Sequence, residues 1–140
     1  MTLPKPTSIT PSMALANLGR ILGTTPSALT PDSISDAAGS THWTSINNWE
    51  QYEDAKLAIM ANLLPTPFKG NLMVVSDHSL TSNGGGLAVA SSQLKELVAG
   101  HLILFGECLF NGDVIIAELG GSLIWMFHHE GAYTLFDRTL

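Results

Sequence analysis

Two glycine-containing dipeptides in the last third of the chain constrain the fold more than any other feature. Asn111-Gly112 and Gly120-Gly121 separate three short apolar runs: Leu102–Phe105, Val114–Ala117 and Leu123–Phe127. Such dipeptides are typical of two-residue hairpin turns, because glycine and asparagine tolerate the positive φ that these turns need. The sequence therefore predicts an antiparallel meander of three strands over Leu102–Phe127. Glu130-Gly131 predicts a further hairpin into a fourth strand over Tyr133–Phe136.

The predicted turns also fix which residues pair across the strands. The second turn pairs Ile116 with Trp125, and the first turn pairs Phe110 with Asp113. Because side chains alternate between the faces of a strand, this pairing divides the predicted sheet into two faces of different composition.

One predicted face carries no charge, and we expect it to form the core beneath the helices; it consists of Leu104, Gly106, Cys108, Ile115, Ala117, Leu119, Ile124 and Met126. The opposite face is apolar and aromatic with two embedded carboxylates; it consists of Phe105, Glu107, Leu109, Val114, Ile116, Glu118, Leu123, Trp125 and Phe127, with Phe136 beside Trp125. Two interpretations of this face stay open. Either the N-terminal segment or another helix covers it, or it is a protein-binding surface, since aromatic anchors with polar neighbours are typical of interface centres.

The first half of the chain predicts helices joined by loops rich in proline, serine and threonine. A first helix is expected over Pro11–Leu22, with Thr10 as N-cap and Gly23 as the C-terminal stop. A second helix is expected to begin near Asn48, with Gln51 completing a capping box, and to end before the Leu64–Pro65 pair. Between these two helices we expect a long loop with one helical turn after Asp32.

The middle of the chain predicts shorter elements. We expect a strand over Asn71–Ser76, a flexible loop over Ser82–Gly86, and a short helix that begins at Ser91 or Ser92 and ends at Gly100. Together these elements predict a single α+β domain over residues 1–140, with N-terminal helices packed on an antiparallel sheet and a C-terminal β-meander. Residues 1–10 are expected to be flexible.

Composition excludes several classes of function. The chain of 140 residues is 45% hydrophobic and 13% charged, so it can bury a substantial core. Six Lys and Arg against twelve Asp and Glu give a net charge of −6, which argues against binding nucleic acid or an anionic membrane. The negative net charge is compatible with binding to a basic protein partner. The single cysteine, the lack of an apolar segment in Met1–Thr10 and the shortness of the apolar runs predict a cytoplasmic protein without disulfide bonds.

Residues that could carry catalysis or bind a metal are few. His128 and His129 are adjacent on a predicted strand, so they should point to opposite faces and should not chelate one metal; we therefore expect no metal and no cofactor. Cys108 is predicted to point into the core, where a thiol behaves as a small hydrophobe. Glu107 and Glu118 are predicted to be neighbours, but the sequence shows no substrate cleft beside them. Asp77-His78 is predicted to end a strand.

The segment Leu87–Glu130 resembles a known family. It combines a short helix over Ser91–Ala99, the run Leu102–Gly106, the turn Asn111-Gly112-Asp113, two apolar strands and a closing His129-Glu130. This order resembles the SUKH superfamily. The resemblance implies an α+β fold and the function of an immunity protein, which binds and neutralises a toxin, often a nuclease, in bacterial conflict systems.

Our leading hypothesis is a non-enzymatic immunity protein that occludes the active or substrate site of a cognate toxin or another basic protein. The residues predicted to bind this partner are acidic or aromatic: Phe105, Glu107, Glu118, Trp125, Phe127, Glu50, Glu53 and Asp54. One alternative is a small hydrolase or transferase that uses Asp77, His78, His128 and His129. Another is an assembly subunit of a phage or secretion apparatus, in which the aromatic sheet face makes the oligomer contact.

Overall fold

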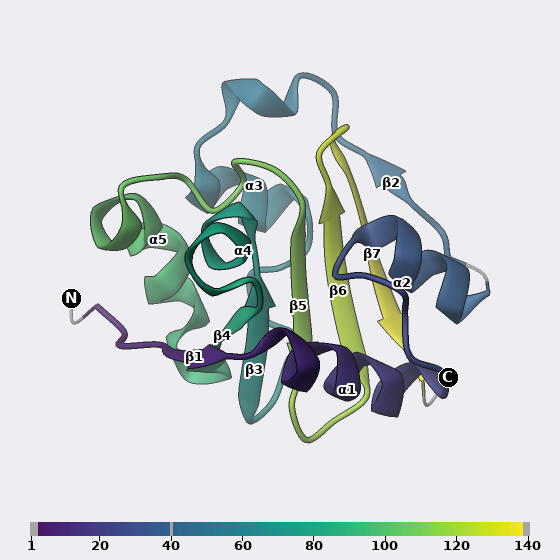
Figure 1. Cartoon of the computed structure of the whole chain (residues 1–140). Coiled ribbons are helices and arrows are strands. Elements are labelled where there is room, and N and C mark those ends of the chain that lie inside the picture. Colours follow the sequence, from purple (N-terminus) through teal and green to yellow (C-terminus); the bar gives the residue numbers. More distant parts are fainter. Residues whose placement is uncertain (1–2, 40, 139–140) are drawn as a thin grey trace.

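A sheet of antiparallel strands forms the centre of the molecule (Figure 1). The computed structural model describes residues 3–39 and 41–138, and in this part of the chain seven strands form one sheet in the order β1-β4-β3-β5-β6-β7-β2. The strands are β1 Thr7–Ile9, β2 Thr44–Ser45, β3 Asn71–Val75, β4 Gly86–Ala90, β5 Val114–Glu118, β6 Leu123–His128 and β7 Ala132–Asp137.

Helices cover both faces of this sheet. They are α1 Pro11–Leu22, α2 Pro31–Ala38, α3 Asp54–Met60, α4 Asp77–Asn83 and α5 Leu94–Phe105, with short 3-10 turns η1 Trp49–Gln51 and η2 Ser91–Gln93. Helices α1 and α2 pack on one face, and α3 and α5 pack on the other. The predicted α+β class, with N-terminal helices on an antiparallel sheet and a C-terminal meander, is confirmed. Within the described residues, no helix combines the length and apolar character that crossing a membrane requires.

Side-chain alternation along the central strands produces two separate cores. On β3, β5 and β6 the odd-numbered residues Met73, Val75, Ile115 and Ala117 and the even-numbered Ile124 and Met126 face α1 and α2. The intervening residues face α3 and α5; they are Leu72, Val74, Val114, Ile116, Trp125 and Phe127. The central strands are therefore buried on both sides, which explains why they lack the polar alternation of a half-exposed strand.

Helix α1 forms where the sequence predicts it, with both termini satisfied. The Thr10 hydroxyl accepts a hydrogen bond from the Met13 backbone N–H (3.2 Å), and Pro11 occupies the first turn. Gly23 adopts φ 82° and its N–H donates to the Gly19 carbonyl (2.9 Å). The next two helices differ from expectation. Helix α2 has eight residues rather than one turn, because Thr30 caps it with an acceptor for the Ser33 N–H.

The helix predicted to begin near Asn48 begins later. Asn48 has φ 57°, and its side chain makes no capping hydrogen bond. Only the 3-10 turn η1 follows, and an extended Tyr52 interrupts the helical path before α3 begins at Asp54. The predicted capping box is therefore wrong.

The largest error concerns the segment before β5. Leu102–Phe105, predicted as the first strand of the meander, is the last part of helix α5. Gly100 does not end that helix; a side chain there would collide with Leu3, so glycine permits a close packing contact. The helix ends at Gly106, which has φ 77° and donates its N–H to the Leu102 carbonyl (2.8 Å).

The consequence is that the hairpin expected at Asn111-Gly112 does not form. Neither residue is among those with positive φ, and both lie in a bend between α5 and β5. The predicted pairing of Phe110 with Asp113 is therefore wrong. Leu104, Gly106 and Cys108, which we assigned to the face beneath the N-terminal helices, do not lie on the sheet.

The strand pairing in the remainder of the meander is confirmed, but the two-residue turn predicted at Gly120-Gly121 is wrong, because neither glycine has positive φ and residues 119–122 form a longer connection. Strand β5 pairs with β6 in the predicted register, with Ile116 opposite Trp125. Strand β7 follows the Glu130-Gly131 turn as expected. In that last hairpin Trp125 lies opposite Leu135, so Phe136 packs on the α1 and α2 side rather than beside Trp125.

Two segments expected to be flexible are ordered parts of the sheet. Residues 1 and 2 lie outside the described residues, but Thr7–Ile9 forms the edge strand β1 and pairs with β4 (Figure 1). The predicted loop over Ser82–Gly86 contains the end of α4 and the start of β4. A side chain at Gly85 would collide with the Ile9 carbonyl, so glycine allows β1 to approach this turn.

The aromatic sheet face is a second core rather than an open surface. Trp125 is 1% exposed and Phe127 is fully buried. The Trp125 indole Nε1–H donates to the Ala61 carbonyl (2.9 Å), just beyond α3, and Phe110 packs edge-on against both aromatic rings. Helices α3 and α5, not the N-terminal segment, cover this face.

We expect Trp125→Ala to destabilise the fold by about 3–5 kcal/mol, because it opens a large cavity and leaves the Ala61 carbonyl unpaired. The matched control is Leu135→Ala, which lies opposite Trp125 in the sheet but is 48% exposed. Urea unfolding monitored by circular dichroism measures both changes. Similar small losses for the two variants would contradict a buried aromatic core.

Candidate functional site

The residues predicted to bind a partner do not form one surface. Of the predicted set, Trp125, Phe127 and Glu118 are buried. Glu118 holds the connection between β5 and β6: its Oε1 accepts from the N–H groups of Ser122 (3.0 Å) and Leu123 (3.1 Å), and its Oε2 accepts from the Lys69 N–H (2.9 Å). These contacts explain why a carboxylate occurs on an otherwise apolar strand. The assignment of these three residues to a partner surface is wrong.

Phe105 and Glu107 are half-buried and lie near a histidine that the sequence did not associate with them. Phe105 stacks on the His78 ring, with centroids 4.1 Å apart and an interplanar angle of 23°. The Glu107 Oε2 lies 3.8 Å from His78 Nδ1. Both residues lie at the C-terminal end of α5, so the structure separates them from the sheet face on which they were predicted.

The remaining three residues, Glu50, Glu53 and Asp54, lie just before α3 and at its first position. Glu50 and Glu53 are exposed. Asp54 is half-buried and anchors the segment before β5, because its Oδ2 accepts from the Leu109 N–H (2.7 Å) and its Oδ1 from the Phe110 N–H (3.2 Å). The exposed side chains of Glu50 and Glu53 are thus available to a partner, whereas the Asp54 carboxylate is occupied by hydrogen bonds within the protein.

A groove lies between the start of α3 and the second half of α5. This α3–α5 groove has a volume of about 270 Å³ and is lined by Glu53, Asp54, Ala55, Val98, Ala99, Leu102 and Cys108. An adjacent hollow shares two of these residues and is lined by Trp49, Glu50, Tyr52, Asp54, Leu57, Cys108, Phe110 and Asn111. Among the described residues that line the two hollows, none carries a positive charge.

One exposed aliphatic side chain, that of Leu102, lines this groove, and that of Ile103 follows it along α5 outside the lining. Leu102 and Ile103 follow one another on α5 and are 56% and 78% exposed. Tyr52, in the adjacent hollow, is 36% exposed. Single exposed apolar residues are common on protein surfaces, but neighbouring ones beside a groove form a patch. Sequence analysis missed this patch because it treated the segment as a buried strand.

Cys108 is exposed and lines both hollows, contrary to the prediction that it points into the core. Its position follows from the end of α5 at Gly106, which places it in the connecting loop. Partial burial and the negative charges of Asp54 and Glu53 raise the pKa of the thiol above its ordinary value. Because the thiolate is the nucleophile, Cys108 is a weak one at neutral pH.

We expect iodoacetamide to modify Cys108 more slowly at pH 7.5 than it modifies glutathione, and the rate to increase about tenfold per pH unit below the thiol pKa. Glu53→Gln removes one of the charges that raise this pKa and should accelerate the reaction at pH 7.5. Intact-mass spectrometry follows the single adduct. A rate that is low at every pH would indicate steric shielding and contradict the electrostatic explanation.

A second group of polar residues gathers at one end of the sheet. Strands β3, β5 and β6 are antiparallel neighbours, so the end of β3, the start of β5 and the end of β6 lie side by side. Asp77 and His78 follow β3, Asp113 precedes β5, and His128 and His129 close β6. Residues of the first turn of α4 and of the end of β6, about fifty positions apart in the chain, are thereby brought to one end of the sheet.

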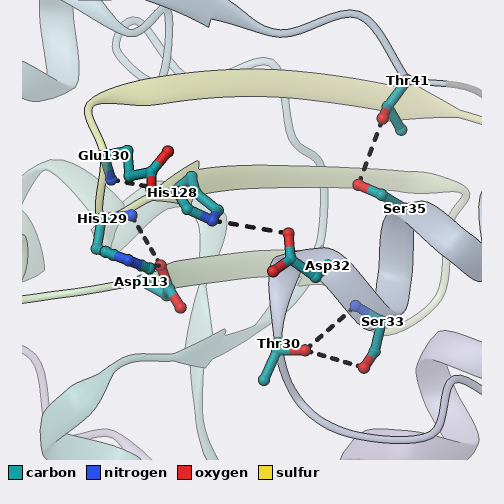
Figure 2. A network of polar contacts seen from close by, with 9 residues as sticks. All are labelled: Thr30, Asp32, Ser33, Ser35, Thr41, Asp113, His128, His129 and Glu130. Carbon is teal, nitrogen blue, oxygen red and sulfur yellow. Dashed lines mark hydrogen bonds and ion pairs between the residues drawn. The ribbon is translucent and has the colours of Figure 1, made fainter.

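The two histidines lie face to face rather than on opposite sides of the sheet. Their rings stack with centroids 4.3 Å apart and an interplanar angle of 26° (Figure 2). Strand β6 ends at His128, and His129 already belongs to the turn into β7. The alternation rule on which the prediction relied applies only within a strand. The prediction that these residues project to opposite faces is therefore wrong.

Asp113 holds His129 in this position. Its Oδ1 accepts the His129 backbone N–H (2.8 Å) and lies 2.8 Å from His129 Nδ1 (Figure 2). This hydrogen bond and the charge of Asp113 raise the pKa of His129 above its ordinary value. His128 is held differently: its Nδ1 accepts from the Glu130 N–H (3.2 Å), and its Nε2 lies 3.6 Å from Asp32 Oδ1.

The four residues of the enzyme hypothesis do not converge on one hollow. The hollow beside His128 is lined by Asp32, Trp43, Ser45, His128, Glu130 and Ala132, so it contains one of the four. His78 instead packs against Phe105. Asp77 lies against Gly112, where a side chain would collide with its carboxylate, and burial together with Asp113 and Glu107 raises its pKa.

His101 is a buried polar residue that the sequence did not single out. It is 1% exposed, and its Nδ1 lies 2.7 Å from the Glu107 carbonyl oxygen. Its Nε2 has no hydrogen-bond partner among the described residues. Burial lowers the pKa of His101 below its ordinary value, although the Glu107 carbonyl and the charge of Asp54 oppose the shift. The side chain thus favours the neutral form, with Nδ1–H as the donor.

This depressed pKa predicts a pH dependence of stability. The unfolded chain binds a proton at His101 near pH 6.5, whereas the folded protein binds it only at lower pH, so the free energy of unfolding should fall as the pH decreases below about 6.5. His101→Asn keeps a donor near the Nδ1 position without titrating, so the decline between pH 6.5 and 5 should be shallower. Urea unfolding across this range measures the difference. If the free energy of unfolding changed with pH in the same way for the variant and the parent protein, the depressed pKa of His101 would not be the cause of the pH dependence.

Comparison of the chain with protein-family models, curated proteins and solved structures gave no match. The similarity to SUKH proteins therefore stays a prediction from the sequence, and the function is inferred below from the geometry of the molecule.

Proposed function

We propose that the protein is a non-enzymatic binding protein of the immunity type, which binds a basic protein partner through the α3–α5 groove. The observation that carries this proposal is the 56% exposure of Leu102 in a groove whose charged residues are acidic, together with the 78% exposure of Ile103, the next residue of α5. This surface replaces the aromatic sheet face on which sequence analysis had placed most of the partner contacts.

The apolar rim supplies the affinity in this proposal. Burying a leucine or isoleucine side chain fully contributes roughly 1.5–3 kcal/mol. Interfaces concentrate their binding energy in a few buried anchors surrounded by polar residues. Leu102 lies on a rigid helix, so it can enter a partner's pocket without prior ordering of a loop. Ile103 points about 100° further round the helix and would contact the partner outside the groove.

The acidic residues supply specificity and a fast association. Glu53 lines the groove and Glu50 the adjacent hollow, and the whole chain carries a net charge of −6. A protein that binds nucleic acid presents Lys and Arg to the phosphate backbone, and an acidic surface is complementary to such a site. A nuclease toxin is therefore the class of partner that we propose, and the cytoplasm is the compartment in which its inhibitor would act.

A second exposed apolar hollow is less suited to this partner. It is lined by Ile59, Leu64, Pro65, Thr66, Ser91, Ser92 and Lys95. Lys95 would repel a basic surface, whereas the α3–α5 groove offers carboxylates. Ile59 is 59% exposed, close to the value for Leu102, so it provides a matched control.

The alternative functions have weaker support. An assembly subunit that uses the aromatic face would need that face exposed, and it is buried beneath α3 and α5. An enzyme that uses Asp77, His78, His128 and His129 would need these side chains around one cavity. The hollow beside His128 contains only one of them.

The test uses the protein encoded by the neighbouring gene, because toxins and their immunity proteins are expected to be adjacent. We expect Leu102→Asp and Ile103→Asp each to weaken binding of this partner more than tenfold, since a charge replaces a buried anchor. Ile59→Asp should change affinity less than threefold. Biolayer interferometry measures the constants, and circular dichroism confirms that all three variants fold.

Charge reversal separates steering from packing. Glu53→Lys should mainly lower the association rate and weaken its dependence on salt, with a smaller effect on dissociation. Equal losses for Ile59→Asp and Ile103→Asp would overturn the choice of groove. Self-association of the parent protein that Ile103→Asp abolishes would identify a second copy of this chain as the occupant and overturn the proposal of a basic partner.

A further inference from the structure

The cluster at the end of β5 and β6 has a property independent of partner binding. Asp113, His128 and His129 each offer one ligand atom, and these three atoms all lie within 4.8 Å of one another. We propose that these residues bind a divalent transition-metal ion, with zinc as the physiological candidate. Asp113 comes from the loop before β5, His128 from the end of β6 and His129 from the turn that follows, and the three side chains lie side by side (Figure 2).

The spacing of the three ligand atoms suits zinc once one of the two stacked rings rotates, so that both nitrogen lone pairs point at the ion. Zn–N distances are about 2.0–2.1 Å and Zn–O distances about 2.0–2.2 Å, so two ligand atoms on one tetrahedral ion lie roughly 3.4 Å apart. The three atoms must therefore approach one another by little more than about 1 Å. His129 has a side chain that is 58% exposed, so its ring has room to rotate.

The backbone holds these residues in place without the metal. Strands β5 and β6 pair Val114 with Phe127, which places Asp113 beside His128. The Asp113 carboxylate also accepts the His129 backbone N–H, which ties the turn to the start of β5. Ligands fixed by sheet hydrogen bonds lose less conformational entropy on binding than ligands on a free loop. The contact between His129 Nδ1 and Asp113 Oδ1 would be exchanged for contacts of both atoms with the ion.

Asp32 lies beside the proposed site. Its Oδ1 lies 3.6 Å from His128 Nε2, and its side chain is 84% exposed. Asp32 lies in the first turn of α2, which Thr30 caps. The Thr30 hydroxyl accepts a hydrogen bond from the Ser33 N–H (3.2 Å) and donates one to the Ser33 hydroxyl (2.9 Å) (Figure 2). Asp32 is not among the three residues whose ligand atoms converge, so its role would be to accept a hydrogen bond from a water that fills the fourth position.

The donor set determines the class of metal. Imidazole ligands suit zinc, copper and nickel, whereas calcium and magnesium prefer oxygen ligands alone. The negative charges of Asp32, Asp113 and Glu130 surround the two rings and favour a cation. Because a copper(II) ion generally binds such sites more tightly than zinc, copper should compete in vitro.

The experiment titrates zinc chloride into the full chain after removal of metal with a chelator, by isothermal calorimetry. All proteins carry Cys108→Ser, which removes the exposed thiol as a competing ligand. We expect one equivalent of zinc to bind, and His129→Gln and Asp113→Asn each to weaken it at least tenfold. The matched controls His42→Gln and Asp36→Asn alter an exposed histidine and an exposed carboxylate outside the cluster, and should change the affinity less than twofold.

Two further readouts exclude misfolding and nonspecific binding. Saturating zinc should raise the melting temperature of the parent protein but not that of His129→Gln, because only a ligand that prefers the folded state stabilises it. Cobalt(II) should give visible absorption bands of tetrahedral coordination that disappear in the same variant. Absence of stoichiometric zinc binding, or equal binding by His129→Gln and His42→Gln, would overturn the proposal. Neither result bears on the α3–α5 groove, which Ile103→Asp tests separately.

Discussion

The pairing of β5 with β6 is the interaction on which the rest of the molecule depends. Every residue of β5 is buried, and the four central residues of β6 are buried as well. Because neighbouring side chains point to opposite faces, one pair of strands contributes to both cores at once: Ile115 and Met126 to the core under α1 and α2, Ile116 and Trp125 to the core under α3 and α5. A shift of register by one residue would exchange the two faces along the whole strand. The short connection through Gly120-Gly121, held by the Glu118 carboxylate, prevents that shift.

Burial on both faces leaves the protein few places to present apolar residues to a partner. The sheet is covered by helices, so a binding surface has to be built from the outer sides of those helices or from the sheet ends. Helix α5 is apolar on nearly all sides: Leu94, Leu97 and Val98 face the core, whereas Leu102 and Ile103 are exposed. Neighbouring apolar residues on the outer side of a helix are typical of a surface that a partner covers. The position of two carboxylates beside that side of α5 supports a basic partner.

The sequence predicted those parts of the fold whose signals are local. Thr10, Pro11 and Gly23 define both ends of α1, and the connection through Gly120-Gly121 defines the β5–β6 register. It failed where an apolar run fits two structures. Leu102–Phe105 is too short for its periodicity to distinguish a buried strand from the end of an apolar helix. Gly100 resembles a helix stop, but it lies inside the helix, where it allows close contact with Leu3. Phe105 and Glu107 were predicted to lie on the same strand as this segment, so the wrong assignment also misplaced these two residues of the candidate site. Glu50 and Glu53 are exposed, and their assignment to a partner surface stays a prediction.

The histidine pair shows a different limit of sequence analysis. Alternation constrains a side chain only while its residue is inside a strand, and the sequence does not fix the last residue of β6 to within one position. That single position decides whether His128 and His129 face apart or stack. Because β5 and the centre of β6 are buried, the ends of these strands are where polar side chains reach solvent. In an antiparallel sheet the end of one strand adjoins the start of its neighbour, so Asp113 and the two histidines meet although fourteen residues separate Asp113 from His128. The metal-ligand geometry is therefore a consequence of the same strand pairing that builds the two cores, whereas the α3–α5 groove depends on where α5 ends. The two proposed sites have separate physical causes, and either can exist without the other.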